Sequence, residues 1–183
     1  MRKKKIIIIC SVIAGIFITW GIFVRPPVDG GKFSSAWGLR FLKGSFFHPG
    51  SDISLPIGSP VHPVTFGKVR ETGFNERHGN YMIISHLPGI ESRYMHMNSL
   101  IAAEGDLVKF RTVIGTVGST GTMSTGPHIH FEIRVLNKPL PAYLICLPGR
   151  MLQKIGLFKL LGGKNRTGGT FHIISGMQPF YTP

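Results

Sequence analysis

Two histidines in one apolar stretch constrain this chain more than any other feature. The stretch covers residues 126–133 and reads GPHIHFEI, and its alternation after His128 predicts a β-strand. Because side chains on a strand alternate between faces, His128 and His130 point the same way, and the apolar residues beside them point into a core. Two neutral imidazoles on one face suit a metal site. For such a pair alone, a polar strand face without metal is the alternative.

A second cluster lies upstream, where residues 48–52 read HPGSD. If that stretch is extended, His48 and Asp52 share a face. Together the two clusters offer two histidines and one aspartate as candidate ligands, with one histidine to spare. A zinc site with three protein ligands keeps its fourth position open for water, which is the arrangement of a hydrolase.

The chain between these clusters and beyond them predicts a mainly β protein. Short β-type segments are separated by turns rich in glycine and proline, and they lie at residues 59–66, 68–72, 80–86, 91–96 and 107–117. Pro88 and Gly89 form the turn of a hairpin. Since no long helical pattern lies between the segments, antiparallel β-sheets are expected. Residues 151–161 carry an amphipathic pattern that predicts a short C-terminal helix.

In this order of motifs the chain resembles peptidase family M23, the lysostaphin- and LytM-like zinc endopeptidases that cut peptide cross-bridges in bacterial cell walls. The family pattern is an H-x-x-x-D motif followed by an H-x-H motif, here His48 to Asp52 and His128 to His130. The resemblance runs from about residue 35 to about residue 143. It includes GSPV at 58–61, GKV at 67–69, HGN at 78–80, YMHM at 94–97 and VIGTVGSTG at 113–121. The ordered set is far more specific than the H-x-H alone.

The resemblance implies a LytM-like domain with an open groove and one zinc ion, held by His48, Asp52 and His130. It also implies catalytic roles for His128 and His96, because the YMH segment ending at His96 matches a family motif. No H-E-x-x-H helix supplies a glutamate base. We expect His128 to be the general base towards the attacking water and His96 to stabilise the tetrahedral intermediate, and the swapped assignment stays open.

Glu132 shares the strand face of His128 and His130 if the alternation holds. It either orients a neighbouring ligand or forms an ion pair with a nearby basic residue. Both interpretations carry equal weight at this point.

Together with these residues, the resemblance implies a zinc-dependent endopeptidase that cleaves peptide cross-links of bacterial peptidoglycan through a metal-activated water. The alternative is a catalytically silent LytM-like module that binds the cell wall or regulates another wall hydrolase. Such relatives usually lose metal ligands, and this chain has all three together with both auxiliary histidines. Glycine cross-bridges and D-amino-acid cross-links are both known substrates in the family.

The charge of the chain is strongly positive. It has 21 Lys and Arg residues against 8 Asp and Glu residues, which gives a formal net charge of +13. This excess predicts attraction to anionic polymers or membrane surfaces. No nucleic-acid partner is expected, because no helix-turn-helix, finger or RNA-binding signature accompanies the charge.

Four basic residues near the amino terminus, at positions 2–5, precede an uncharged and mostly apolar run over residues 6–24. The run is long enough to cross a hydrocarbon core of roughly 30 Å as a helix. Because only Arg25 directly follows, the bias places the amino terminus in the cytoplasm. We expect a single-pass anchor in the bacterial inner (cytoplasmic) membrane, with the catalytic domain on the periplasmic or extracellular side. Cleavage of a signal peptide and secretion is the alternative, although no Ala-x-Ala site follows the run.

Four segments are therefore expected along the chain. They are a basic tip and membrane anchor at residues 1–25, a linker at 26–34, the peptidase domain at 35–145 and a basic extension of unknown role at 146–183. The two cysteines, Cys10 and Cys146, fall in different segments and do not form a disulfide framework.

Overall fold

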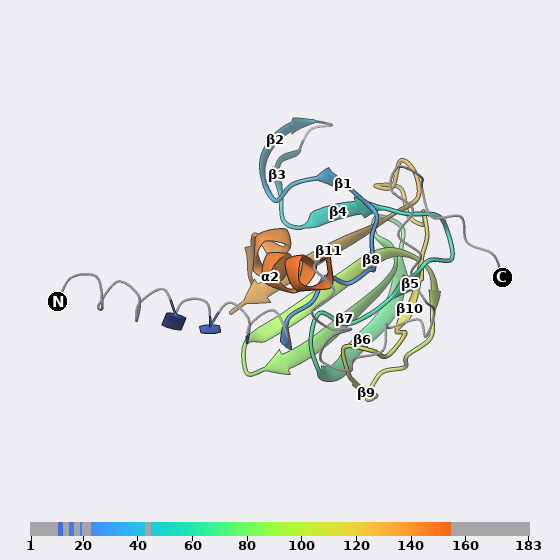
Figure 1. Cartoon of the computed structure of the whole chain (residues 1–183). Coiled ribbons are helices and arrows are strands. Elements are labelled where there is room, and N and C mark those ends of the chain that lie inside the picture. Colours follow the sequence, from blue (N-terminus) through green and yellow to red (C-terminus); the bar gives the residue numbers. More distant parts are fainter. Residues whose placement is uncertain (1–10, 13–14, 17–18, 20–22, 43–44, 155–183) are drawn as a thin grey trace.

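The computed structural model describes residues 11–12, 15–16, 19, 23–42 and 45–154 (Figure 1). Its strands, in chain order, are β1 (Lys32–Ser35), β2 (Gly38–Leu42), β3 (Ser45–His48), β4 (Ser51–Ser54), β5 (Pro60–Val61), β6 (Gly67–Asn75), β7 (Gly79–Leu87), β8 (Ile90–Leu100), β9 (Leu107–Val108), β10 (Gly115–Val117), β11 (His128–Val135) and β12 (Lys138–Leu140). The helix α2 (Ala142–Lys154) follows them.

Most of these strands belong to one antiparallel sheet, in the order β1-β4-β11-β8-β7-β6-β9. At its sides β10 pairs with β5 and β8, and β12 pairs with β11. Among the described residues, β2 and β3 pair only with each other, and this β2–β3 arm stands away from the large sheet in Figure 1. The prediction of a mainly β, antiparallel architecture is confirmed.

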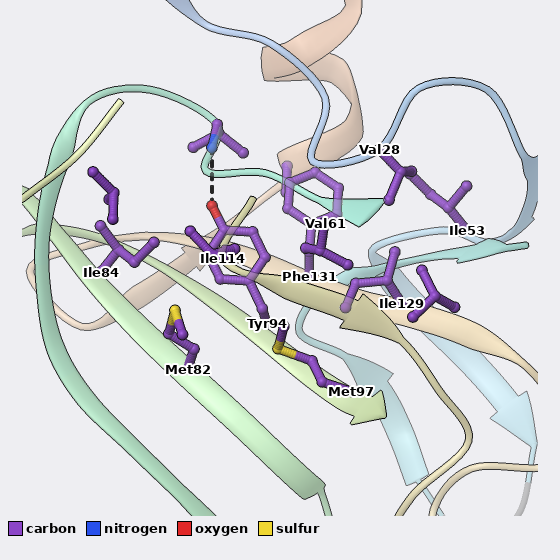
Figure 2. Close-up of a cluster of buried hydrophobic side chains, with 14 of the residues drawn as sticks. Val28, Ile53, Val61, Met82, Ile84, Tyr94, Met97, Ile114, Ile129 and Phe131 are labelled. Carbon is purple, nitrogen blue, oxygen red and sulfur yellow. Dashed lines mark hydrogen bonds between the residues drawn. The ribbon is translucent and has the colours of Figure 1, made fainter. Parts of the chain in front are cut away.

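Strand β11 lies inside the sheet, between β4 and β8. Its alternation works as predicted, because Ile129 and Phe131 are completely buried in the hydrophobic core. Tyr94 on β8 belongs to the same core (Figure 2), and its hydroxyl accepts a hydrogen bond of 2.9 Å from the Val64 amide. Since a buried amide without a partner costs about 1–3 kcal/mol, this bond fixes the 62–66 loop on the sheet.

The stretch expected to be a linker packs against the sheet. Pro26, Pro27 and Val28 are buried, and β1 pairs with β4. The His62 amide donates to the Pro27 carbonyl at 2.7 Å, and the Arg25 amide donates to the Val64 carbonyl at 2.8 Å. Proline has no amide hydrogen, so the two prolines enter this packed region without leaving a donor unpaired. The packed body therefore already includes Arg25.

Helix α2 begins at Ala142, well before the segment at 151–161 in which a helix was predicted. Ala142 and Cys146 are both part of the core, and the ring of Tyr143 lies 4.1 Å from that of Phe33. The helix therefore crosses the expected boundary at residue 145. The amphipathic pattern missed its start because Pro148, inside the helix, interrupts the periodicity.

Most of the predicted membrane anchor, residues 6–24, lies outside the described residues. The same holds for the basic tip at residues 1–5 and for the extension beyond residue 154. Within the part of the chain that the structure describes, no helix is both long enough and apolar enough to cross a membrane.

Candidate metal centre and active site

The structure brings the three predicted ligands together from three strands. His48 ends β3, Asp52 lies on β4, and His130 lies directly opposite Asp52 in the pairing of β4 with β11. Asp52 Oδ1 lies 2.7 Å from His130 Nδ1 and 3.3 Å from His48 Nε2, and the two histidine nitrogens are 3.1 Å apart. Among the described residues, these three form the group of His, Cys, Asp and Glu side chains that could hold a metal ion.

The spacing of these atoms fits a tetrahedral metal. Zinc bonds of about 2.0–2.1 Å at tetrahedral angles place neighbouring ligand atoms about 3.3 Å apart. The three observed separations, 2.7, 3.1 and 3.3 Å, fall at or slightly below that value. Two imidazoles and one carboxylate are also a set of ligands that zinc accepts.

Hydrogen bonds on the outer side of both rings orient their lone pairs towards the centre. His48 Nδ1 donates to the Ala36 carbonyl at 2.7 Å, and His130 Nε2 donates to a Glu132 carboxylate oxygen at 3.2 Å. Because a neutral imidazole carries one N–H, the inner nitrogens, His48 Nε2 and His130 Nδ1, then present lone pairs. Two lone pairs and one carboxylate oxygen meeting at one point require a positive charge between them.

The electrostatics agree with that requirement. Burial lowers the pKa of His130, but hydrogen bonds and charge interactions with Asp52 and Glu132 outweigh burial and raise it to about 9. Burial raises the pKa of Asp52, whereas the hydrogen bonds from His130 and His48 bring it well below its usual range. The centre therefore favours a cation, which is a proton in the metal-free protein.

The backbone beside the centre leaves no room for a side chain at Gly50. A Cβ atom there would lie 2.6 Å from both His130 Nε2 and the Phe131 carbonyl oxygen. Gly50 stands inside the H-x-x-x-D motif, so the motif needs its glycine to let β4 approach β11. The ligand pattern alone gave no signal for this role.

His96 and His128 lie next to the ligands. Their ring centroids are 4.8 Å apart, and His128 Nε2 is 4.0 Å from Asp52 Oδ1. Each Nδ1 donates to a backbone carbonyl, that of Thr120 for His96 at 2.8 Å and that of Gly126 for His128 at 2.7 Å. In its neutral form, each ring then carries its N–H on Nδ1 and a lone pair on Nε2, the tautomer of a proton acceptor.

His96 adopts an unusual backbone conformation, with φ of 64° inside strand β8. Such values are uncommon for residues other than glycine, and they cluster at functional sites. Burial, the largest effect, lowers the pKa of His96 to about 4, even though the hydrogen bond to Thr120 acts in the opposite direction. His96 is therefore neutral at pH 7.

A cleft of about 450 Å³ contains all five predicted site residues. One wall comes from the β2–β3 arm through Phe47, and another comes from the turn-rich segment at residues 118–126. The remaining lining residues are Pro49, Arg77, His78, Met95, Thr122, Met123, Thr125 and Glu132. His78, which is not one of the predicted site residues, also borders the cleft.

Glu132 combines both interpretations that the sequence left open. Its side chain is only 2% exposed, and its carboxylate accepts hydrogen bonds from His130 Nε2 and, at 2.6 Å, from Arg134 Nε. Burial raises the pKa of Glu132, but the hydrogen bonds and charges of His130 and Arg134 bring it to about 2. Glu132 therefore stays ionised, and it orients the His130 ring while it pairs with Arg134.

Removing the charge of Glu132 is expected to weaken metal binding. A carboxylate behind a metal-bound imidazole fixes the ring and raises its basicity, so Glu132→Ala should cost about 10–100-fold in metal affinity. Glu91→Gln is the matched control, because Glu91 is also buried and also pairs with arginines, but lies outside the cleft. The measurement is competition for zinc against a chelating dye. Equal zinc affinity in the two variants would contradict an orienting role for Glu132.

Residues 46–141 match the description of peptidase family M23. The chain therefore belongs to peptidase family M23.

Two curated relatives show the kind of enzyme that the chain is similar to. It is 40% identical over 101 residues to the peptidoglycan DD-endopeptidase ShyB of Vibrio cholerae. The matched region covers 55% of this chain and 24% of that relative. It is 37% identical over 131 residues to the DD-carboxypeptidase/endopeptidase Mpg of Neisseria meningitidis, and this match covers 70% of this chain and 30% of that relative. The chain thus spans less than a third of the length of either relative.

Solved structures agree on the fold. A zinc containing peptidase from Vibrio cholerae superimposes with a TM-score of 0.61 at 36% identity, covering 66% of this chain and 39% of that one. The catalytic domain of lysostaphin from Staphylococcus simulans superimposes with a TM-score of 0.59 at 29% identity, covering 64% of this chain and 92% of that domain. The predicted family and the LytM-like fold are confirmed.

Proposed function

We propose that this protein is a zinc-dependent endopeptidase that cleaves peptide cross-links of bacterial peptidoglycan. One observation carries the proposal: the ligand atoms of His48, Asp52 and His130 converge in one cleft beside two further histidines, His96 and His128. Zinc held by these three residues would supply a Lewis acid, which lowers the pKa of water and polarises a peptide carbonyl. The names of the relatives support peptidoglycan as the substrate class.

The chain's own residues account for proton transfer in this proposal. His128 Nε2 takes a proton from the attacking water and returns it to the leaving amine, while its Nδ1 stays fixed on the Gly126 carbonyl. The negative charge that develops on the tetrahedral intermediate favours the charged form of His96, so its Nε2 takes a proton from solvent, donates a hydrogen bond to the oxyanion, and returns the proton to solvent when the intermediate collapses. Since both rings have the same tautomer and lie side by side, the structure is also compatible with the swapped roles.

The test is mass spectrometry of purified wall fragments after incubation with the zinc-loaded full chain. Fragments with D-amino-acid cross-links and fragments with glycine bridges are offered in parallel, because relatives are named for each type of bond. Cleavage that requires zinc supports the proposal and identifies the bond. A zinc-loaded protein that binds fragments and cleaves none of them would instead support the silent, regulatory module.

We also propose that residues 6–24 anchor the protein in the cytoplasmic membrane, with residues 25–154 outside. The apolar run and the basic residues before it support this proposal. The full chain is expected to stay in the membrane fraction after alkaline washing, and a tag at its carboxyl terminus should be accessible from outside. Recovery of a soluble form that begins near Val28 would support secretion instead. A cut there would remove Arg25 and the two buried prolines from the packed body.

A further inference from the structure

The point where the apolar run ends is fixed on the domain. Arg25 directly follows the run, and its amide donates to the Val64 carbonyl at 2.8 Å. Its guanidinium lies 5.5 Å from the centre of the Phe110 ring. The chain therefore leaves the proposed anchor directly beside two segments of the domain, the loop at 62–66 and the segment at 107–111.

These two segments continue into a short two-stranded ribbon, β6 with β9. Gly67 pairs with Val108, and Lys68 pairs with Leu107. In an antiparallel pair, opposite residues share a face and neighbours alternate, so Phe66, Lys68, Leu107 and Lys109 lie on one face. Val108, on the other face, is buried in the core at 3% exposure. We call the four outward residues the β6–β9 face.

The β6–β9 face combines apolar and cationic side chains. Leu107 is 83% exposed and Phe66 is 53% exposed, and Lys68 and Lys109 are exposed beside them. Single exposed apolar residues are common, but two on one face between lysines are typical of a surface that enters a lipid headgroup layer. Arg111, which is exposed and lies near the Phe110 ring, adds further positive charge. Glu104 and Asp106 are exposed acidic residues just before β9 in the sequence, and the three exposed cations Lys68, Lys109 and Arg111 outnumber them.

We propose that the β6–β9 face rests on the anionic headgroups of the membrane in which the chain is anchored. The inference depends on the proposed anchor and adds to it a fixed orientation of the domain. The position of the proposed anchor and the composition of the β6–β9 face both favour contact between this face and the membrane. Arg25 brings the anchor close to this face, and the exposed side chains of Phe66 and Leu107 lie among cationic side chains there. Lysine near an anionic membrane contributes about fivefold each to such a contact.

This orientation places the candidate metal centre away from the bilayer. Strand β9 is at one edge of the sheet, and four strand-to-strand steps separate it from β11, which carries His128 and His130. At roughly 4.8 Å a step, that is about 19 Å. In Figure 1, β9 and the β2–β3 arm lie at opposite ends of the domain. The cleft would therefore face the wall while the β6–β9 face lies on the lipid.

The test uses the full chain in nanodiscs, with an environment-sensitive fluorophore on a single cysteine. Leu107→Cys is compared with Leu39→Cys on β2, where the leucine is equally exposed at 82%, and both variants carry Cys10→Ser and Cys146→Ala. In nanodiscs containing phosphatidylglycerol, the label at position 107 should shift to the blue and be shielded from an aqueous quencher. The label at position 39 should do neither. In nanodiscs of phosphatidylcholine alone, the shielding at position 107 should weaken.

Charge reversal tests the role of the lysines. Adding Lys68→Glu and Lys109→Glu should shift the contact equilibrium at position 107 towards water by at least about 25-fold, from fivefold for each lysine. The control is Lys32→Glu with Lys138→Glu, which changes the net charge equally on β1 and β12, and it should leave the shielding intact.

Three outcomes would overturn the inference, and they differ from one another. Equal quenching at positions 107 and 39 in an embedded protein would reject the membrane contact and leave the anchor standing. A full chain that does not enter nanodiscs would reject the anchor and the contact together. Shielding at position 107 by a soluble anionic wall polymer, with none by lipid, would assign the face to the wall.

Discussion

Replacing any one of His48, Asp52 and His130 by alanine is expected to remove most of the bound zinc. The wild-type domain should bind about one zinc ion, the stoichiometry of a mononuclear site. Each replacement removes one of three atoms that converge within 4.8 Å of one another. The loss of affinity should therefore exceed the roughly 10–100-fold expected for a residue, such as Glu132, that acts through a ligand.

The His128→Ala variant is the internal control for this experiment. His128 lies on the same strand as His130 and on the same face, but its Nε2 is 4.0 Å from the Asp52 oxygen, whereas His130 Nδ1 is 2.7 Å away. It should keep its zinc. Zinc content is measured on dialysed protein by elemental analysis, together with circular dichroism to confirm that each variant is folded. Full zinc occupancy in a folded His48, Asp52 and His130 triple variant would show that the metal binds elsewhere.

Much of this centre could be predicted from the sequence, because its ligands come from elements with a strong local pattern. The alternation of β11 alone places His128 and His130 on one face and buries Phe131 on the other. The partnership of His130 with Asp52, 78 residues earlier, came from the resemblance to a family. Periodicity cannot predict which strands pair over such a separation.

The groups that orient the histidines could not be predicted in the same way. The carbonyls of Ala36, Thr120 and Gly126 hold the Nδ1 atoms of His48, His96 and His128, respectively. Every residue has a carbonyl group, so a sequence pattern carries no signal for this role. The positive φ of His96 is equally invisible, since it is a property of the folded backbone and falls on a residue that rarely adopts it.

The ends of the domain differ from the expectation for a further physical reason. Turn-rich composition at residues 26–31 suggested a linker, but Val28 and two prolines fill a space beside the core. Composition describes how a segment behaves when nothing contacts it. Here hydrogen bonds with residues 62–64 hold the segment in place, so tertiary contacts decided its structure.

Replacing His128 by alanine is expected to abolish turnover while leaving zinc and fold unchanged. General acid–base assistance is typically worth about 10²–10⁴-fold, so the loss should be large. His96→Ala should lose about 10²–10³-fold, the usual cost of removing one donor that stabilises an oxyanion. Binding of wall fragments should survive both changes, because it depends on the rest of the cleft and on the positive surface.

The double variant tells whether the two histidines act as a unit. Their rings are 4.8 Å apart, close enough for their effects to be coupled. If both serve one proton-transfer step, the double variant should lose little more than His128→Ala alone, because residues that act together have strongly non-additive effects. Independent roles would instead multiply the two losses. His86→Ala, a histidine outside the cleft, is the matched control and should cleave as the wild type does.

These rates must be measured on the same preparations as zinc content and fragment binding. A variant that loses cleavage together with zinc would indicate a ligand, whereas loss of cleavage alone is the expected signature of His128 and His96. Undiminished cleavage in both single variants would contradict the mechanism while leaving the metal centre intact. A partial loss of cleavage is informative too, because each ring is fixed through its Nδ1 atom to a backbone carbonyl. Rescue of His128→Ala by added imidazole would show that the missing group transfers a proton and does not merely fill space.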